Sequence, residues 1–315
     1  MRRRSFSLLA LAACVPGEKS PTGEAGTIPP HDGDERTRSM PRASGDVAQD
    51  TQPVTADALA ARVEALTAEF GPRGFSVIAQ SPWIVLGDES HAEVQRRATG
   101  TVAWASRHLA DAFFSRDPTV IVEIWLFRDI NSYMAHAKSI FGDEPDTPFG
   151  YYSFAHQALI MNIASGGGTL VHEMVHPLMR ANFPACPSWF NEGLASLFEQ
   201  CGQENGRIVG YTNWRLAGLQ QAIADGTVPS FETLLATTED GFYSDDLGTN
   251  YAQARYLCYW LQEQGKLRAF YRDFVATAEA DPTGIEALAR HANTHDLGAF
   301  QRQWEAYVTR LRFEA

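Results

Sequence analysis

Segments typical of β-strands occur almost entirely before Gly168 in this chain of 315 residues. The strongest is "TVIVEIWLF" (119–127), in which β-branched and aromatic residues dominate. From Gly168 onward nearly every segment has the caps and periodicity of helices, apart from a candidate hairpin near Arg207–Tyr211. This separation of strands from helices predicts an α+β fold. Before Gly168 we expect helices over 55–71, 92–114 and 128–142, a hairpin over 75–88, and a strand pair over 151–164.

The first 14 residues, "MRRRSFSLLALAAC", predict an export signal. Three arginines precede an apolar run from Phe6 to Ala13, which is too short to span a bilayer. The last four residues, "LAAC", resemble a bacterial lipobox, which implies a signal peptide over 1–13 and lipid on Cys14. The protein would then be anchored in the bacterial cell envelope, on a periplasmic or other extracytoplasmic face. A plain secretory signal with an incidental cysteine is the alternative, and "RRRSF" also resembles a twin-arginine signal.

Residues 14–54 are rich in Pro, Gly, Ser, Thr and charged residues. Such a segment buries too little apolar surface to offset its ordering entropy, so it is predicted to be a disordered tether. Without the three arginines of residues 1–13, 23 basic residues remain against 38 acidic ones, a net charge of −15. This acidic balance argues against nucleic acid as a partner.

Three cysteines remain if Cys14 carries lipid. Cys186 and Cys201 bracket a predicted helix, which would hold them about 20 Å apart and prevent a disulfide between them. A bond between Cys201 and Cys258 agrees with the sequence, and so do three buried thiols.

The segment "GGGTLVHEMVHPLM" (166–179) places His172 and His176 four residues apart. Residues four apart on a helix lie about 40° from each other around its axis, so both imidazoles can reach one metal ion. Glu173 lies about 100° from His172 and would therefore not be a ligand. Short patterns of this kind also arise by chance, so the rest of the chain must support the site.

A candidate third ligand, Glu192, lies in "PSWFNEGLASLFEQ" (187–200). A catalytic zinc ion takes three protein ligands and leaves one position for water. Glu192 lies among many apolar residues, where a carboxylate needs a cation or a metal as its partner. The alternative is a solvent-facing carboxylate that interacts with the dipole of its helix. The small residues Gly193 and Ala195 would let a second helix approach closely.

Together "HEMVH" and "WFNEGLAS" resemble the gluzincin group of zinc metallopeptidases in the peptidase MA-like superfamily. The resemblance implies that His172, His176 and Glu192 bind one Zn²⁺ ion per chain and that Glu173 is the general base. It also implies a zincin-like fold for a metallopeptidase domain over 55–315. A small mixed sheet would form an upper lobe over about 72–182, and a mostly helical lower lobe would span about 183–315. Residues 1–118 carry no signature of the group.

Two positions depart from the pattern of this group. Pro177 directly follows His176, and proline removes a helix hydrogen bond and disfavours α geometry in the residue before it. We therefore expect the helix to kink at His176 or to end there. Ser196 stands four residues after Glu192, where some members carry an acid that orients a histidine. The sequence therefore names no group that holds the ligands in place.

These residues predict a zinc-dependent peptidase acting on a peptide or protein substrate. Zinc-bound water ionises near neutral pH, and Glu173 can accept its proton and pass it to the leaving amine. The strand pair over 151–164 can present an edge along which an extended peptide aligns. One alternative is a catalytically silent lipoprotein that keeps this fold for binding or envelope assembly. Another is a hydrolase of non-peptide amides.

The helix predicted in "TNYAQARYLCYWLQ" (249–262) carries Tyr251 and Arg255 one turn apart on the same face. It resembles the aminopeptidase-like branch of the group, in which a tyrosine opening such a helix stabilises the oxyanion, and this implies a catalytic role for Tyr251. Packing against neighbouring helices is the alternative, which would leave Arg255 or Tyr243 as the donor. A second histidine pair, "HANTH" (291–295), has no glutamate beside it and is predicted to be a solvated helix end.

Overall fold

The computed structural model describes residues 54–145, 147–153, 155–244 and 248–313. The predicted signal peptide, Cys14 and nearly all of the predicted tether lie outside this part of the chain. Among the described residues, no helix is both long enough and apolar enough to cross a membrane.

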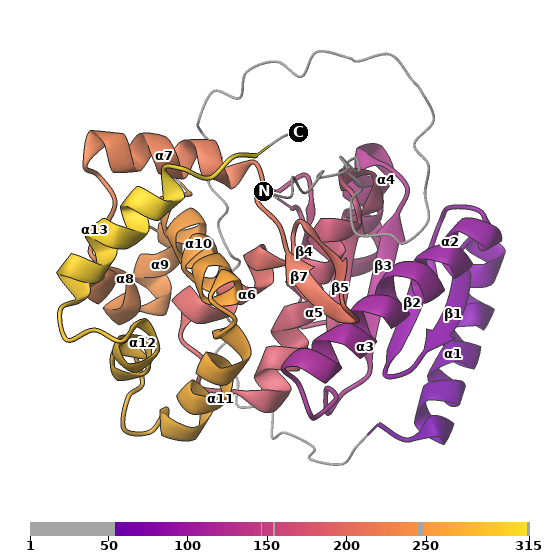
Figure 1. Ribbon diagram of the computed structural model, residues 1–315. Helices are drawn as coiled ribbons and strands as arrows, with labels where there is room; N and C mark the ends of the chain where they lie inside the picture. The colour runs from indigo at the N-terminus through magenta and orange to yellow at the C-terminus, as the bar shows by residue number, and fades with distance from the viewer. Residues whose placement is uncertain (1–53, 146, 154, 245–247, 314–315) are drawn as a thin grey trace, which may run out of the picture.

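A mixed five-stranded sheet forms the centre of the first half of the described chain (Figure 1). Its strand order is β1-β2-β3-β5-β4, in which β2 and β5 run parallel to β3 while β1 and β4 run antiparallel to their neighbours. The edges of the sheet are therefore β1 and β4. The strands are β1 (Ser76–Gln80), β2 (Trp83–Gly87), β3 (Val122–Phe127), β4 (Gly150–Ser153) and β5 (Ala158–Asn162), which confirms every strand predicted in this half.

Helices cover both faces of the sheet, because alternate residues of each buried strand point to opposite sides. On one face Trp125 and Phe127 of β3 pack with α1 (Ala56–Phe70) and α4 (Ile130–His136). On the other face Ile124 and Leu126 pack with α2 (His91–Arg97), α3 (Ala103–Ala112) and α5 (Gly167–Asn182). The sheet is thus the middle of three layers, with α5 on the face that meets the second half of the chain (Figure 1).

Local sequence signals explain the boundaries of several elements. The side chain of Thr55 accepts a hydrogen bond from Ala58 N at 3.1 Å and caps α1, as its place before a helical pattern predicts. The turn at Ser81-Pro82 joins β1 to β2 as the expected hairpin. The helix expected over 92–114 consists of α2, a π-helical turn (Ala98–Val102) and α3.

The second half of the described chain is helical except for one hairpin, β6 (Cys201–Glu204) and β7 (Arg207–Gly210), which confirms the hairpin expected near Arg207. The molecule is therefore mixed α+β, with its sheet in the first half. The helices of this half are α6 (Ser188–Leu197), α7 (Arg215–Asp225), α8 (Phe231–Ala236), α9 (Glu239–Ser244), α10 (Thr249–Glu263), α11 (Leu267–Thr277), α12 (Ile285–Ala292) and α13 (Leu297–Val308).

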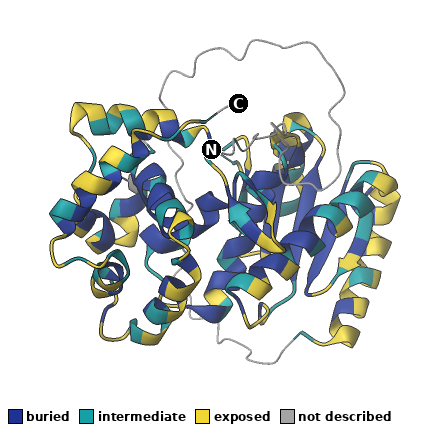
Figure 2. Ribbon diagram, viewed as in Figure 1, coloured by how far each residue is buried: buried dark blue, intermediate teal, exposed yellow. Residues whose placement is uncertain are grey.

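One hydrophobic core joins the two halves. It runs from Ile78 of β1 through α5, α6 and α10 to Val308 of α13. Figure 2 shows this core as a band of buried ribbon that crosses the middle of the molecule. The helices α5 and α6 lie at the junction, so the residues they carry are held by packing from both halves.

Candidate metal centre

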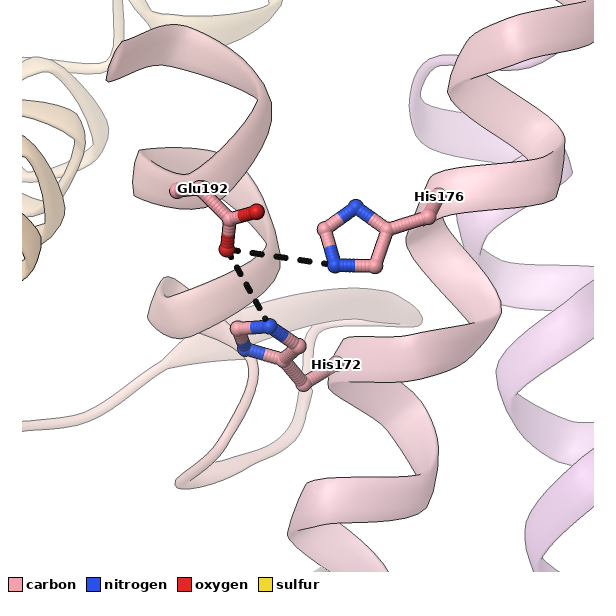
Figure 3. Close-up of side chains that lie close together, drawn as sticks. All are labelled: His172, His176 and Glu192. Atoms are coloured by element: carbon pink, nitrogen blue, oxygen red, sulfur yellow. Dashed lines mark ion pairs between the residues drawn. The ribbon is translucent and has the colours of Figure 1, made fainter. Parts of the chain in front are cut away.

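The helix α5 carries His172 and His176 on one side, as their spacing predicts (Figure 3). Their ring centroids lie 5.0 Å apart. The helix continues through Pro177 to Asn182, so the expectation that it could end at His176 is wrong. Pro177 and the neighbouring residues Val175, Leu178 and Met179 are buried, and this packing holds the helical conformation despite the hydrogen bond that proline cannot make.

The neighbouring helix α6 brings Glu192 against both imidazoles (Figure 3). Its Oε2 lies 3.4 Å from His172 Nε2 and 3.9 Å from His176 Nε2. The Glu192 residue is only 5% exposed, so the alternative of a solvent-facing carboxylate is wrong. One donor atom from each of these three residues lies within 4.8 Å of the others. A buried group of this kind can hold a metal ion.

The position of Glu192 depends on the close approach of α6 to α10. A Cβ on Gly193 would lie 2.9 Å from the backbone oxygen of Ala254 and 3.1 Å from Cys258 Sγ. A larger residue than glycine would therefore push the two helices apart. This confirms the prediction that a second helix approaches at Gly193.

Tyr243 fixes the second oxygen of the Glu192 carboxylate. The Tyr243 hydroxyl, which comes from α9, donates a hydrogen bond of 2.7 Å to Glu192 Oε1. Burial raises the pKa of Glu192, but the two imidazoles and this hydroxyl outweigh burial and lower it to about 2. Glu192 is thus an anion whose Oε2 is directed at the two histidines.

The Nδ1 atoms of both histidines face polar side chains that lie behind the site. Asn191 Oδ1 lies 3.1 Å from His176 Nδ1, and Glu199 Oε1 lies 3.4 Å from His172 Nδ1. Partners of this kind set which ring nitrogen is available to a metal. Ser196, which stands four residues after Glu192, has a buried hydroxyl with no hydrogen bond inside the described residues.

Glu199 was not identified from the sequence, although it occupies the same buried environment. It follows the buried residues Leu197 and Phe198 and is itself 8% exposed, paired with Arg215 at 2.8 Å. A carboxylate directly after an apolar run is the one signal that could have pointed to it. Burial raises the pKa of Glu199, but Arg215 and His172 outweigh burial and leave it well below the ordinary value.

His172 lies between two carboxylates, which stabilise a positive charge at its imidazole. Burial lowers its pKa, but Glu192 on one side and Glu199 on the other outweigh burial and raise it to about 10. Two anions that hold a proton on one imidazole this firmly can also stabilise a metal cation in place of that proton.

Glu173 adjoins the donor group without belonging to it. This agrees with its expected orientation about 100° away from His172 around the helix. Burial raises the pKa of Glu173 above the ordinary value for a glutamate. A carboxyl group with a raised pKa is better matched to accepting a proton near neutral pH than an exposed one.

Tyr251 lies in the first turn of α10, beside the same group of charges. Burial raises its pKa well above the ordinary value, and Glu192 is the next largest cause. Its ring packs against Phe242 and Tyr243, with centroids 5.2 and 6.2 Å away. Tyr251 therefore makes the ring contacts expected of a packing residue, and it also lies next to the candidate metal site.

The two other candidates for the oxyanion donor have structural partners. Arg255 is fully buried and donates to the backbone oxygens of Ser196, Leu197 and Tyr211. Two of its guanidinium nitrogens donate to these carbonyls, which makes Arg255 a cap at the end of α6. The Tyr243 hydroxyl is engaged by Glu192.

Two further expectations concern cysteines and the second histidine pair. Cys258 is a free, buried thiol and is therefore not bonded to Cys201. His291 lies in the last turn of α12, 3.2 Å from Asp273 Oδ2, whereas His295 lies beyond the end of that helix and is exposed. The pair therefore marks a helix end, as predicted, but only His295 is solvated.

No model of a known protein family matches the chain, and no curated protein matches it in sequence.

Proposed function

We propose that the protein is a zinc-dependent peptidase with a zincin-like fold, similar to the gluzincin group. The observation that carries this proposal is the buried group of His172, His176 and Glu192, with Glu173 beside it on the same helix. Two imidazole nitrogens and one carboxylate oxygen form a donor set typical of catalytic zinc. These residues fit zinc better than calcium or magnesium, which prefer oxygen ligands.

In this proposal, the three donors would hold the ion, which when bound would lower the pKa of a water molecule and polarise a carbonyl group. Glu173 accepts a proton from the attacking water and gives it to the leaving amine. Its raised pKa and its place outside the donor group support this role. Tyr251 donates its hydroxyl proton in a hydrogen bond to the oxyanion.

We further propose that an extended peptide binds along β4. This strand is an edge of the sheet, and the backbone nitrogen of Asn162 in β5 donates to Phe149 O at 2.9 Å, just before β4 begins. Hydrogen-bonded pairs alternate along an antiparallel ladder, so Gly150 and Tyr152 direct their backbone groups outward. Those groups can pair with a substrate backbone.

We also propose that lipid on Cys14 tethers the enzyme in the bacterial envelope, with residues 15–54 as the spacer. This part of the proposal rests on the sequence "LAAC" and on the composition of the segment that follows it.

The decisive experiment is peptide-library cleavage by the purified protein with and without a chelator, beside the variant Glu173→Gln. Glutamine keeps the size and polarity of Glu173 but cannot accept the proton. We therefore expect zinc to stay bound while turnover falls at least about 100-fold. Glu286→Gln is the matched control, because this glutamate is exposed on α12. Unchanged turnover in Glu173→Gln would refute the general-base role, and zinc binding without any turnover in the wild type would favour a silent protein.

A further inference from the structure

Arg215, the first residue of α7, contacts two separate parts of the candidate site. Its Nε donates to Glu199 Oε2 at 2.9 Å and its Nη2 donates to Glu199 Oε1 at 2.8 Å. This is the two-pronged geometry in which a guanidinium fixes the plane of a carboxylate. Because the same Oε1 lies 3.4 Å from His172 Nδ1, Arg215 fixes the group that faces the back of a candidate ligand.

The same guanidinium also lies over the ring of Tyr251. The Arg215 Cζ atom lies 5.3 Å from the centroid of the Tyr251 ring. A planar cation at this distance is attracted to the ring and restricts its position. A lysine cannot make both contacts, since its ammonium is a point charge without a fork or a face.

The backbone next to Arg215 is also held by hydrogen bonds. Asn213 is fully buried; its Nδ2 donates to Glu199 Oε2 at 2.9 Å, and its Oδ1 accepts from Arg215 N at 3.2 Å. The backbone nitrogen of Asn213 also donates to the Tyr256 hydroxyl at 3.0 Å. These hydrogen bonds fix the backbone from which the Arg215 side chain extends toward the candidate site.

We propose that Arg215 is a positioning residue that couples the metal centre to Tyr251: its edge orients His172 through Glu199, and its face orients the tyrosine. The inference rests on the proposed function for the role of Tyr251, whereas the part that concerns His172 requires only metal binding. Occupancy of the metal site and alignment of the oxyanion donor would then depend on one side chain.

The test is Arg215→Lys in the full-length protein, alone and combined with Tyr251→Phe, with zinc affinity measured by chelator competition and kcat at saturating zinc. Arg215→Lys should weaken zinc binding by about 10-fold or more, because the partner behind His172 loses its orientation. Arg215→Lys should also lower kcat. The factor by which it lowers kcat should be at least about threefold smaller in the Tyr251→Phe background than in the wild type, because the two residues act as one unit. Tyr251→Phe alone should leave zinc affinity within about twofold of the wild type, since the ring is kept.

The matched control is Arg290→Lys, because Arg290 makes a similar two-nitrogen ion pair with Asp273 on the surface of α12. It should change neither zinc affinity nor kcat.

Zinc affinity within twofold of the wild type in Arg215→Lys would overturn the proposal, and so would independent, multiplicative losses of kcat in the double variant. If Arg215→Lys does not fold, Glu199→Gln tests the part of the connection that runs through Glu199 to His172. This change keeps the shape of the side chain and should weaken zinc binding about 10-fold, and an unchanged zinc affinity would overturn that part of the proposal. A wild type that binds zinc without turnover refutes the peptidase proposal alone. In that case the coupling is tested by near-ultraviolet circular dichroism of the tyrosines. Arg215→Lys should change this spectrum in the wild type but not in the Tyr251→Phe background. The same spectral change in both backgrounds would refute the coupling.

Discussion

Replacing Gly168 with alanine should weaken both the fold and the metal centre. Gly168 lies in the first turn of α5, one turn before His172. A Cβ at this position would stand 1.9 Å from the backbone oxygen of Glu199 and 2.8 Å from its carbonyl carbon. Ordinary contact begins at 3.4 Å. The oxygen would therefore have to retreat by about 1.5 Å, and the whole peptide group would move with it.

The magnitude follows from two opposing effects. Overpacking in a filled interior costs about 1–3 kcal/mol, and more where backbone rather than a flexible side chain must move. The better helix propensity of alanine offsets at most about 1 kcal/mol. We therefore expect a net loss of about 2 kcal/mol, which lowers the melting temperature by about 4–8 °C in a domain of this size. Because the displaced residue faces His172, zinc affinity should fall about 10-fold as well.

Differential scanning calorimetry and chelator competition measure the two effects, and Gly218→Ala is the control. Gly218 lies inside α7 with nothing within 4 Å of the position its Cβ would take. The same substitution should therefore stabilise the protein there, by up to about 1 kcal/mol. If Gly168→Ala melts at or above the wild-type temperature with unchanged zinc affinity, the close contact between α5 and Glu199 is not a constraint on the site.

Alanine at His172, His176 or Glu192 should remove most of the zinc found by elemental analysis, and full retention in Glu192→Ala would exclude that residue as a ligand. Tyr251→Phe should lower kcat and kcat/KM together while zinc content and melting temperature stay near wild type, because only the hydroxyl is lost. An unchanged kcat would leave Tyr251 with a packing role alone. Cys14→Ser should abolish lipid labelling and release the protein from membranes. Membrane association that survives a salt wash in this variant would contradict the lipid anchor.

The elements that the sequence predicted correctly are those whose signal lies within the element itself. Thr55 caps α1 because its own hydroxyl reaches a backbone nitrogen three residues on. The buried strand β3 consists of β-branched, aromatic and other apolar residues with one glutamate, a composition that indicates a strand by itself. The donors His172 and His176 are one helical turn apart, so their meeting depends only on the helix that carries them.

Pro177 shows where local reasoning was insufficient. The missing hydrogen bond of a proline inside a helix costs about 3 kcal/mol, which is enough to end a helix that stands alone. Here several buried side chains on α5 are held by the core that joins the two halves. Their burial outweighs the local cost, and a pattern of neighbouring residues does not contain that information.

The groups that hold the candidate ligands in place were missed for a related reason. Tyr243 lies 51 residues from Glu192 in the sequence, and Arg215 lies 16 residues from Glu199. Their meeting depends on how α6, α7 and α9 pack against one another, which the short motifs around each residue do not specify. The grouping of the candidate ligands was therefore predictable from their motifs, whereas the residues that support them could be identified only from the assembled fold.

The reactivity of the free thiol of Cys258 can be used to follow the contact between α6 and α10. The side chain has no exposed surface, its Sγ lies directly beneath Gly193, and burial raises its pKa above the ordinary value. A thiol reagent can therefore reach Cys258 only when the two helices separate, one residue away from Glu192. Cys186, which is partly exposed, would react first and can be replaced by serine. The labelling rate of Cys258 would then report how often α6 and α10 separate beside the candidate metal centre. A metal ion that links α5 to α6 should slow this labelling in proportion to its affinity.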